Sequence, residues 1–268
     1  MNQLQKEVVN DLKGISSDLG YSPGRREVPP LLNRKACNYF GSFNKAKELA
    51  GLSITKRKCD PLLKKAYVKD KDLVKLVSFL TCDGHLYKDL KGLSLYSNNN
   101  HILKKYENLI KKKFNIGGFY GLTGGFGYCE SYNVFNVNIC KFLDSIGVPK
   151  GDKMITSFDV PNWIKKNREF SRTYLKIAFL CEGCKYRASK NTERIQINLN
   201  KSEDLLNDGL KFMNSLRFML KQFGINTTKI RVSKGNVRKK DGKITKCMRF
   251  EIRANTTNKF IKKIGWYK

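Results

Sequence analysis

The sequence predicts an α+β protein in which one unit, helix–strand–strand–helix–strand–strand–helix (αββαββα), occurs twice after a small all-helical segment. Three observations predict this fold. An apolar run that ends in an acid followed by glycine occurs twice, and 99 positions separate the two acids, Asp83 and Glu182. The same order of helical and alternating patterns follows each run. Three short helical patterns precede the first run.

The N-terminal segment has apolar residues at helical spacing over residues 3–19, and Gly20 supplies a stop signal. Two shorter helices are expected at residues 33–40 and 44–50. We therefore expect a helical module over residues 1–52, followed by a basic linker over residues 53–69. Three short helices with basic connections are typical of a helix-turn-helix-like DNA module, although a bundle that only supports the main domain fits the same pattern.

The two repeated units are expected at residues 70–150 and 151–268. In the first, strands are predicted at residues 85–88, 93–98, 116–127 and 132–138, with helices at residues 102–114 and 139–146. In the second, strands are predicted at residues 184–187, 194–199, 229–233 and 246–253, with helices at residues 203–223 and 257–264. Two such units, with their acidic helices at the centre, predict a pseudo-twofold saddle of two antiparallel sheets.

Each acidic run predicts a buried helix that carries its acid at the C-terminal end. Gly84 and Gly183 are placed where a left-handed residue commonly ends a helix. A carboxylate beside the unpaired carbonyls at this end needs a neighbouring cation, and a hard divalent ion would satisfy both groups. The small residue Ser78 favours close packing of the helices, which would bring Asp83 and Glu182 together. Two ordinary core helices with chance acid–glycine turns are the alternative.

The formal net charge of +30 indicates an extended polyanionic partner. Nucleic acid is favoured over a membrane because no apolar stretch approaches the roughly 18 residues of a spanning helix. The N-terminus lacks the apolar core of a secretory signal, so we expect an intracellular protein, cytoplasmic or nucleoid-associated, with its eight cysteines reduced. Cys181 and Cys184 have CxxC spacing without a second such pair, so a structural zinc site is not expected.

Alternating strands predict a surface that contacts DNA. In residues 194–199, Arg194, Gln196 and Asn198 alternate with apolar residues, and these side-chain types suit base edges in the major groove. A sheet whose second face is merely solvated is the alternative. The remaining candidates lie on the other strands: Lys229, Arg231, Arg249 and Arg253 in the second unit, and Ser94, Tyr96 and Asn98 in the first. The basic turn at residues 234–243 is expected to contact phosphates.

Both acidic runs resemble the dodecapeptide motif of the LAGLIDADG homing endonucleases. The resemblance rests on Leu76-Val77-Ser78-Phe79-Leu80-Thr81-Cys82-Asp83-Gly84-His85 and Leu175-Lys176-Ile177-Ala178-Phe179-Leu180-Cys181-Glu182-Gly183-Cys184, and it extends from about residue 62 to the end of the chain. The sequence departs from the motif at Ser78 and Ile177, where the family often has glycine, and at Thr81 and Leu180. The N-terminal segment resembles the homing-endonuclease-associated repeat at Leu19–Glu27, Tyr39–Ala46 and Ala50–Leu52.

This resemblance implies a single-chain, two-motif enzyme in which the motif helices form the central interface and each acid binds a catalytic divalent metal. Asp83 and Glu182 are then the metal ligands and Mg²⁺ (or Mn²⁺) the expected ion, since no His or Cys set converges there. Lys185 is a catalytic candidate that would organise water or stabilise charge. The implied reaction cleaves double-stranded DNA with short 3′ overhangs, by a monomer with internal pseudo-twofold symmetry, for intron or intein homing.

Two other classes of function remain open. The same scaffold occurs in RNA maturases and in a bacterial regulator, so a nucleic-acid-binding protein without cleavage is one alternative. A basic structural protein with incidental acids is another. The chain begins Met1-Asn2 and ends Tyr267-Lys268, without the residues of protein splicing, so it is not expected to be an intein. Loss of metal-dependent cutting in Asp83→Asn or Glu182→Gln would separate the endonuclease from both.

Overall fold

The computed structural model describes residues 1–268 except 20, 55–67, 126, 190–191 and 267–268. Packing divides the chain into two compact units. The first unit is Met1–Tyr67 with Lys91–Cys140, and the second unit is Val68–Leu90 with Lys141–Lys268. The first acidic run therefore clusters with the C-terminal half of the chain. Most of the predicted linker lies outside the described residues.

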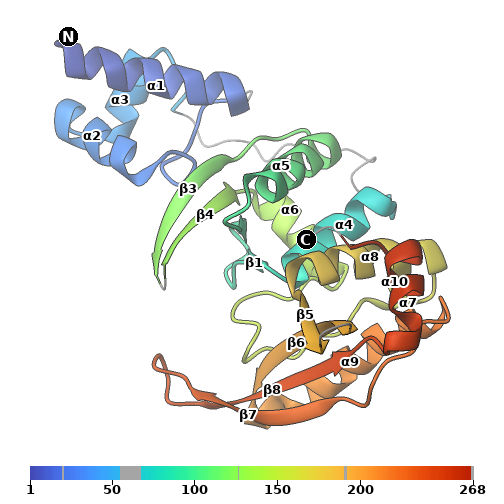
Figure 1. Cartoon of the computed structure of the whole chain (residues 1–268). Coiled ribbons are helices and arrows are strands. Elements are labelled where there is room, and N and C mark those ends of the chain that lie inside the picture. The colour runs from blue at the N-terminus through green and yellow to red at the C-terminus, as the bar shows by residue number, and fades with distance from the viewer. Residues whose placement is uncertain (20, 55–67, 126, 190–191, 267–268) are drawn as a thin grey trace. The chain divides into compact units, whose positions relative to one another are not determined.

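The N-terminal module consists of three helices, as predicted: α1 (Gln3–Leu19), α2 (Pro30–Phe40) and α3 (Phe43–Leu49) (Figure 1). Buried apolar residues from all three form its core, among them Leu12, Ala36 and Phe43. Helix α2 begins three residues earlier than expected because Pro30 occupies the first helical turn, where its missing N–H costs no hydrogen bond. The Ser42 hydroxyl caps α3 by accepting a hydrogen bond from the Lys45 N–H.

The remaining elements follow the predicted order. The first repeat contains α4 (Lys71–Thr81), β1 (Gly84–Leu86), β2 (Leu93–Tyr96), α5 (Asn100–Phe114), β3 (Phe119–Gly125), β4 (Gly127–Val134) and α6 (Val137–Ser145). The second contains α8 (Arg168–Cys181), β5 (Gly183–Ser189), β6 (Thr192–Ser202), the 3₁₀ turn Glu203–Leu205, α9 (Leu206–Lys221), β7 (Arg231–Val237), β8 (Ile244–Glu251), the 3₁₀ turn Ala254–Thr256 and α10 (Thr257–Lys263). A short helix, α7 (Asn162–Lys165), lies between the repeats and was not anticipated.

The strands form two four-stranded sheets with the same topology, β1-β2-β4-β3 and β5-β6-β8-β7. In each sheet the second strand of the repeat pairs with the fourth, which in turn pairs antiparallel with the third. The predicted α+β fold with an internal repeat is therefore confirmed at the level of topology.

Within the second unit, one face of the β5–β8 sheet is covered by α9 (Figure 1). Ile195 and Ile197 of β6 and Phe250 of β8 are fully or almost fully buried on this side. They pack with the apolar side of α9, where Leu216 and Leu220 are also buried. The opposite face of this sheet is left to the polar side chains that alternate with the buried ones.

Several predicted segments need correction. The strand expected at residues 132–138 is β4, which already begins at Gly127, within the strand expected at residues 116–127. It ends at Val134, because the Asn136 side chain accepts a hydrogen bond from the Ile139 N–H and starts α6. The helix expected at residues 203–223 is split into a 3₁₀ turn and α9, and α9 ends at Lys221. Gly224, with φ +67°, follows in the left-handed conformation that terminates helices.

Candidate functional site

The ends of α4 and α8 place the two acids. Asp70 caps the start of α4 by accepting a hydrogen bond from the Leu73 N–H at 2.8 Å, and Asp83 lies two residues beyond the last helical residue. Asn167 caps α8 in the same way. Glu182 is the C-cap of α8, and its N–H donates to the Ala178 carbonyl at 2.9 Å. Each acid therefore lies just past its helix rather than in the last turn.

Helices α4 and α8 pack against each other through small side chains, as predicted. Ser78 is fully buried, and its hydroxyl donates to the Tyr174 carbonyl oxygen at 3.0 Å. Ala178 of α8 is also fully buried. Ile177, at the position where a branched residue is unexpected, is 8% exposed. A hydroxyl bonded directly to the backbone of the neighbouring helix requires the close approach that small residues permit.

The glycines that follow the acids have a different role from the predicted one. Neither Gly84 nor Gly183 has the left-handed φ expected of a helix stop. A Cβ at Gly84 would lie 2.7 Å from the Leu80 Cα, and a Cβ at Gly183 would lie 2.3 Å from the Phe179 carbonyl oxygen. Glycine is required because the chain turns back against the helix it has just left.

The cation at the end of α4 is Lys153, a residue that the sequence did not single out. Its Nζ donates to the carbonyls of Leu80 (3.3 Å), Thr81 (3.0 Å) and Gly84 (2.7 Å), and also to that of Cys82. The free carbonyls and the helix dipole make this end a favourable place for a positive charge. The electrostatic prediction of a cation is therefore confirmed, but an ammonium takes the carbonyls that had been assigned to a metal ion.

Both acids act on Lys153. Burial lowers the pKa of Lys153 below its usual value, whereas Glu182 and Asp83 oppose this shift. A hydrogen bond with the Cys82 thiol, burial and the Asp83 carboxylate together raise the pKa of Cys181 well above its usual value. The end of α8 therefore lies beside Cys82 and Asp83, and the two acidic runs converge at one point of the second unit.

His85 lies next to this point on β1. Burial and the positive charges of Lys153 and Lys240 lower the pKa of His85, against the opposing effect of Asp152, so the imidazole is neutral at pH 7. Its ring lies 5.3 Å from that of Tyr87. A half-buried imidazole packed beside an aromatic ring fits a structural role for His85.

Lys185 lies on β5 directly opposite Ile195 of β6. Opposite residues of an antiparallel pair share one face, so Lys185 lies on the face of Ile195 and not on that of Gln196. Its Nζ is 2.6 Å from a carboxylate oxygen of Glu193. In this structure the Lys185 ammonium is therefore ion-paired with Glu193 of the neighbouring strand.

The predicted alternation of β6 is confirmed. Ile195 and Ile197 are buried, while Arg194, Gln196 and Asn198 are half-buried on the other face. Asn198 pairs in register with Arg249 of β8, and Arg249 pairs with Arg231 of β7. We call these three residues, Asn198, Arg249 and Arg231, the polar row, since their side chains lie side by side across three strands.

Arg194 has a partner within the sheet. Its Nη1 lies 2.9 Å from a carboxylate oxygen of Glu251, which is 7% exposed. Burial disfavours ionisation of Glu251, but hydrogen bonds from Arg194 and Tyr186 hold the pKa of this carboxyl below its usual value. A base edge would therefore have to compete with Glu251 for Nη1 of Arg194.

Two of the predicted strand residues of the second unit fall outside the strands. Lys229 is exposed and precedes β7, and Arg253 follows β8 and donates from Nε to the Thr227 carbonyl at 3.2 Å. The alternation expected at residues 229–233 is wrong, because β7 is exposed on both faces and Val232 is 44% exposed. As the last strand of its sheet, β7 has no second neighbour to bury it.

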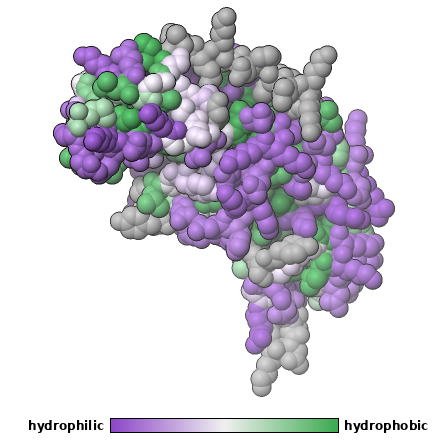
Figure 2. Space-filling view, turned by 90° about the horizontal axis from the view of Figure 1, so that it is seen from above, coloured by the Kyte–Doolittle hydropathy of each residue, from purple (hydrophilic) through white to green (hydrophobic). Residues whose placement is uncertain are grey.

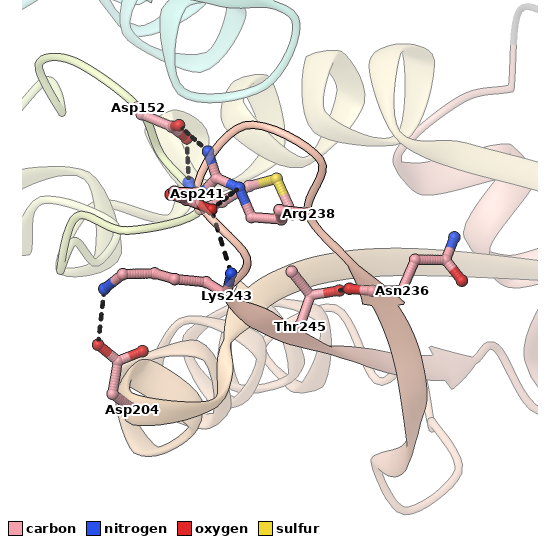
Figure 3. Close-up of polar contacts among 8 residues, drawn as sticks. Asp152, Asp204, Asn236, Arg238, Asp241, Lys243 and Thr245 are labelled. Carbon is pink, nitrogen blue, oxygen red and sulfur yellow. Dashed lines mark hydrogen bonds and ion pairs between the residues drawn. The ribbon is translucent and has the colours of Figure 1, made fainter.

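The basic turn between β7 and β8 is partly tied to acids of the second unit (Figure 3). Arg238, which is 10% exposed at its side chain, is ion-paired with Asp152 and lies 3.3 Å from Asp241. Lys243 lies 3.3 Å from Asp204. The Arg238–Asp152 pair fixes the hairpin against the segment that carries Lys153, and the Lys243–Asp204 pair fixes it against the 3₁₀ turn Glu203–Leu205. The turn therefore has a structural role besides any contact with phosphates.

The three candidates of the first unit have different surroundings. Ser94 is fully buried, and its hydroxyl donates to Asn133 Oδ1 at 2.7 Å. Tyr96 is half-buried opposite Ser131, and Asn98 is exposed beyond the end of β2. Only Tyr96 and Asn98 of this set present side-chain surface.

The surface is largely hydrophilic on the face shown in Figure 2. None of the helices in the part of the chain that the structure describes is long and apolar enough to cross a membrane. Among those same residues, no group of three or more His, Cys, Asp or Glu side chains is arranged to hold a metal ion.

Comparison with known proteins gives weak likenesses. No family model matches the chain. It is 27% identical over 182 residues to the tRNA-splicing ligase RtcB of Methanopyrus kandleri, covering 62% of this chain and 18% of the relative. It is 32% identical over 127 residues to the DNA-directed RNA polymerase subunit Rpo1N of Methanocaldococcus jannaschii, covering 46% and 9%. The chain thus spans less than a fifth of the length of these relatives.

Three solved structures resemble the chain at low sequence identity. The homing endonuclease I-WcaI bound to its DNA recognition sequence has a TM-score of 0.47 at 11% identity, over 81% of this chain and 91% of that one. Mesophilic variants of the homing endonuclease I-DmoI have a TM-score of 0.46 at 13% identity, over 75% and 91%. The N-terminal LAGLIDADG domain of DUF199/WhiA has a TM-score of 0.45 at 13% identity, over 78% and 86%. Likenesses at this level assign neither activity nor substrate.

Proposed function

We propose that this chain is a site-specific double-stranded DNA endonuclease that depends on a divalent metal, built on the LAGLIDADG scaffold. The observation that carries the proposal is the convergence of Asp83 and Glu182. The two acids follow a pair of helices in direct contact, and both act on the ammonium of Lys153. Two carboxylates at one point, in a chain with a formal net charge of +30, suit hydrolysis of a polyanion.

The donor set fits an ion that is shared with the substrate rather than one enclosed by protein. Mg²⁺ is usually held by one or two carboxylates together with substrate phosphates and water. Asp83 and Glu182 are the carboxylates that would hold it. The carbonyls at this helix end contribute less, since the three N–H donors of Lys153 are already shared among those of Leu80, Thr81 and Cys82 and that of Gly84 in β1. When bound, the ion would polarise the phosphate and lower the pKa of an attacking water.

The residues of the chain itself perform binding and charge neutralisation. The ammonium of Lys153, which donates to carbonyls beside both acids, would lower their mutual repulsion and favour the approach of a phosphate. The polar row supplies two guanidiniums and an amide on one sheet face, suited to guanine and adenine edges. Lys185 is the further catalytic candidate. To reach a substrate on the polar row, it would have to leave both Glu193 and the sheet face that it shares with Ile195.

DNA binding without cleavage is the second candidate function. The observation that favours it is the hydrogen bonding of Lys153 to the helix end, because an ammonium there repels a divalent ion. An RNA maturase or a transcriptional regulator on the same scaffold belongs to this class, and RNA would then be a partner. In either case we propose an intracellular protein that acts as a monomer, with short 3′ overhangs if it cleaves.

The test is cleavage of a random or host-derived DNA library by the full chain with Mg²⁺, Mn²⁺ or EDTA. We expect cutting with metal that is lost in Asp83→Asn and in Glu182→Gln, while the affinity for the selected site, measured in Ca²⁺, stays within about threefold. Glu203→Gln removes the same charge from an exposed surface ion pair and serves as control. Site-specific binding with no cutting in any metal would select the second candidate, and cutting that survives both substitutions would remove the mechanism.

A further inference from the structure

A basic pocket of about 490 Å³ opens on the second unit, between the exposed side of α9 and the segment that follows β8. Arg217, Phe218 and Lys221 of α9 line it together with Thr227 and Arg253. None of the described residues that line it is acidic. Since α9 covers the apolar face of its sheet, the pocket is separate from the polar row on the opposite face.

Two arginines from different elements are held in place around Thr227. Arg217 donates from Nε to the Thr227 hydroxyl at 2.9 Å and from Nη1 to Asn214 Oδ1 at 2.9 Å. Arg253 donates from Nε to the Thr227 carbonyl at 3.2 Å. Within the described part of the chain, Nη2 of Arg217 and both Nη atoms of Arg253 make no hydrogen bond and are available to a ligand. Fixed guanidinium groups lose little side-chain freedom when they bind an anion, and their geometry suits phosphate.

Phe218 adds an aromatic surface beside these cations. Its side chain is 57% exposed, whereas Phe212 on the same helix is buried. A single exposed aromatic residue is ordinary on a protein surface. An exposed ring next to two oriented arginines and a lysine is the combination that proteins use to stack one base and hold its phosphate. A base within a duplex is already stacked, so this arrangement selects an unpaired nucleotide.

We propose that this pocket binds one nucleotide of a single-stranded nucleic acid, with the phosphate on Arg217 and Arg253 and the base on the Phe218 ring. The site is independent of the proposed cleavage of duplex DNA, because it uses neither the acids nor the polar row. It would let the protein hold a single strand and a duplex at the same time.

Fluorescence anisotropy with labelled U10 and dT10 tests the proposal on the full chain, in the presence of an unlabelled duplex that saturates the other basic surfaces. We expect Phe218→Leu to weaken binding about tenfold, because stacking is lost while an apolar side chain remains. Phe218→Trp should stay within about twofold. Arg217→Gln and Arg253→Gln should each reduce the salt dependence by about 0.7 in log–log slope, the value for one phosphate contact.

Lys211→Gln is the matched control, since it removes one positive charge from an exposed position of α9 outside the pocket. Thermal melting of each variant checks the fold. Equal affinity of Phe218→Leu and Phe218→Trp would overturn the stacking of a base on Phe218. Salt slopes of Arg217→Gln and Arg253→Gln equal to that of Lys211→Gln would overturn the phosphate contacts. Stronger binding of U10 than of dT10, or the reverse, identifies RNA or DNA as the strand. Unchanged duplex affinity in Phe218→Leu is expected, because the two surfaces are separate.

Discussion

Replacement of Lys153 by methionine tests the link between the helix end and the two acids. The substitution keeps most of the side-chain volume and removes three N–H donors, which are shared among four backbone carbonyls. At about 1 kcal/mol for each donor, the loss is roughly 3 kcal/mol. The burial that lowers the pKa of Lys153 also penalises the wild-type ammonium, which reduces the expected net loss to about 2 kcal/mol. For a chain of this size the melting temperature should fall by roughly 4–8 °C.

Melting curves of Lys153→Met and of a control variant, followed by circular dichroism, measure this fall in melting temperature. Lys150→Met is the control, because Lys150 and Asp144 form a surface ion pair at 2.9 Å that should contribute less than about 1 kcal/mol. Adding Mg²⁺ should raise the melting temperature of Lys153→Met more than that of wild type, since the carbonyls and carboxylates become open to an ion. A fall no larger than that of Lys150→Met would refute the assignment of Lys153 as the cation of the site.

Three further outcomes are expected. In a urea titration, Gly183→Ala should lower the free energy of unfolding by about 2–4 kcal/mol, because the new Cβ would lie 2.3 Å from the Phe179 carbonyl oxygen. Gly14→Ala is the control and should be neutral or stabilising, because the space around its Cβ is open. Burial lowers the pKa of Lys201 from 10.5 to about 8, so as the pH rises the folded state loses this proton before the unfolded state does. The stability of the wild type relative to Lys201→Met should therefore rise between pH 8 and pH 10.5, which melting curves at each pH would measure. Arg249→Gln in the polar row should weaken binding of the selected duplex by about 1–3 kcal/mol and relax its preference at one base pair, and unchanged affinity and base preference would remove this row from the interface.

Most of the element order could be predicted because it depends on local pattern. The spacing of apolar residues marks α1, α5 and α9, and strict alternation marks β6, since helix and strand have different periods. The burial of the edge strand β7 was predicted wrongly, because that prediction also relied on local alternation alone. Alternation in the sequence shows which residues share a face, but it cannot show whether anything covers that face.

The site was predictable in part. The expectation that Asp83 and Glu182 lie near one another follows from the repeat, and the need for a cation follows from the charge at a helix C-terminus. Lys153 lies about 70 positions from the helix end that it contacts, in an irregular segment without a motif. Asp152, which precedes Lys153 in the chain, is ion-paired with Arg238 of the β7–β8 hairpin. This pair is another contact between distant parts of the chain.

The sequence alone determined the repeat, the fold class, the basic charge and the two acids, because each depends on the identity and spacing of residues along the chain. Only the tertiary structure decided that an ammonium holds the end of α4, and that Gly84 and Gly183 serve close approach rather than a left-handed turn. It also decided that Arg253 belongs to a pocket on the helical side of its sheet. These properties depend on which distant atoms come within hydrogen-bond or van der Waals distance, and no local pattern encodes that.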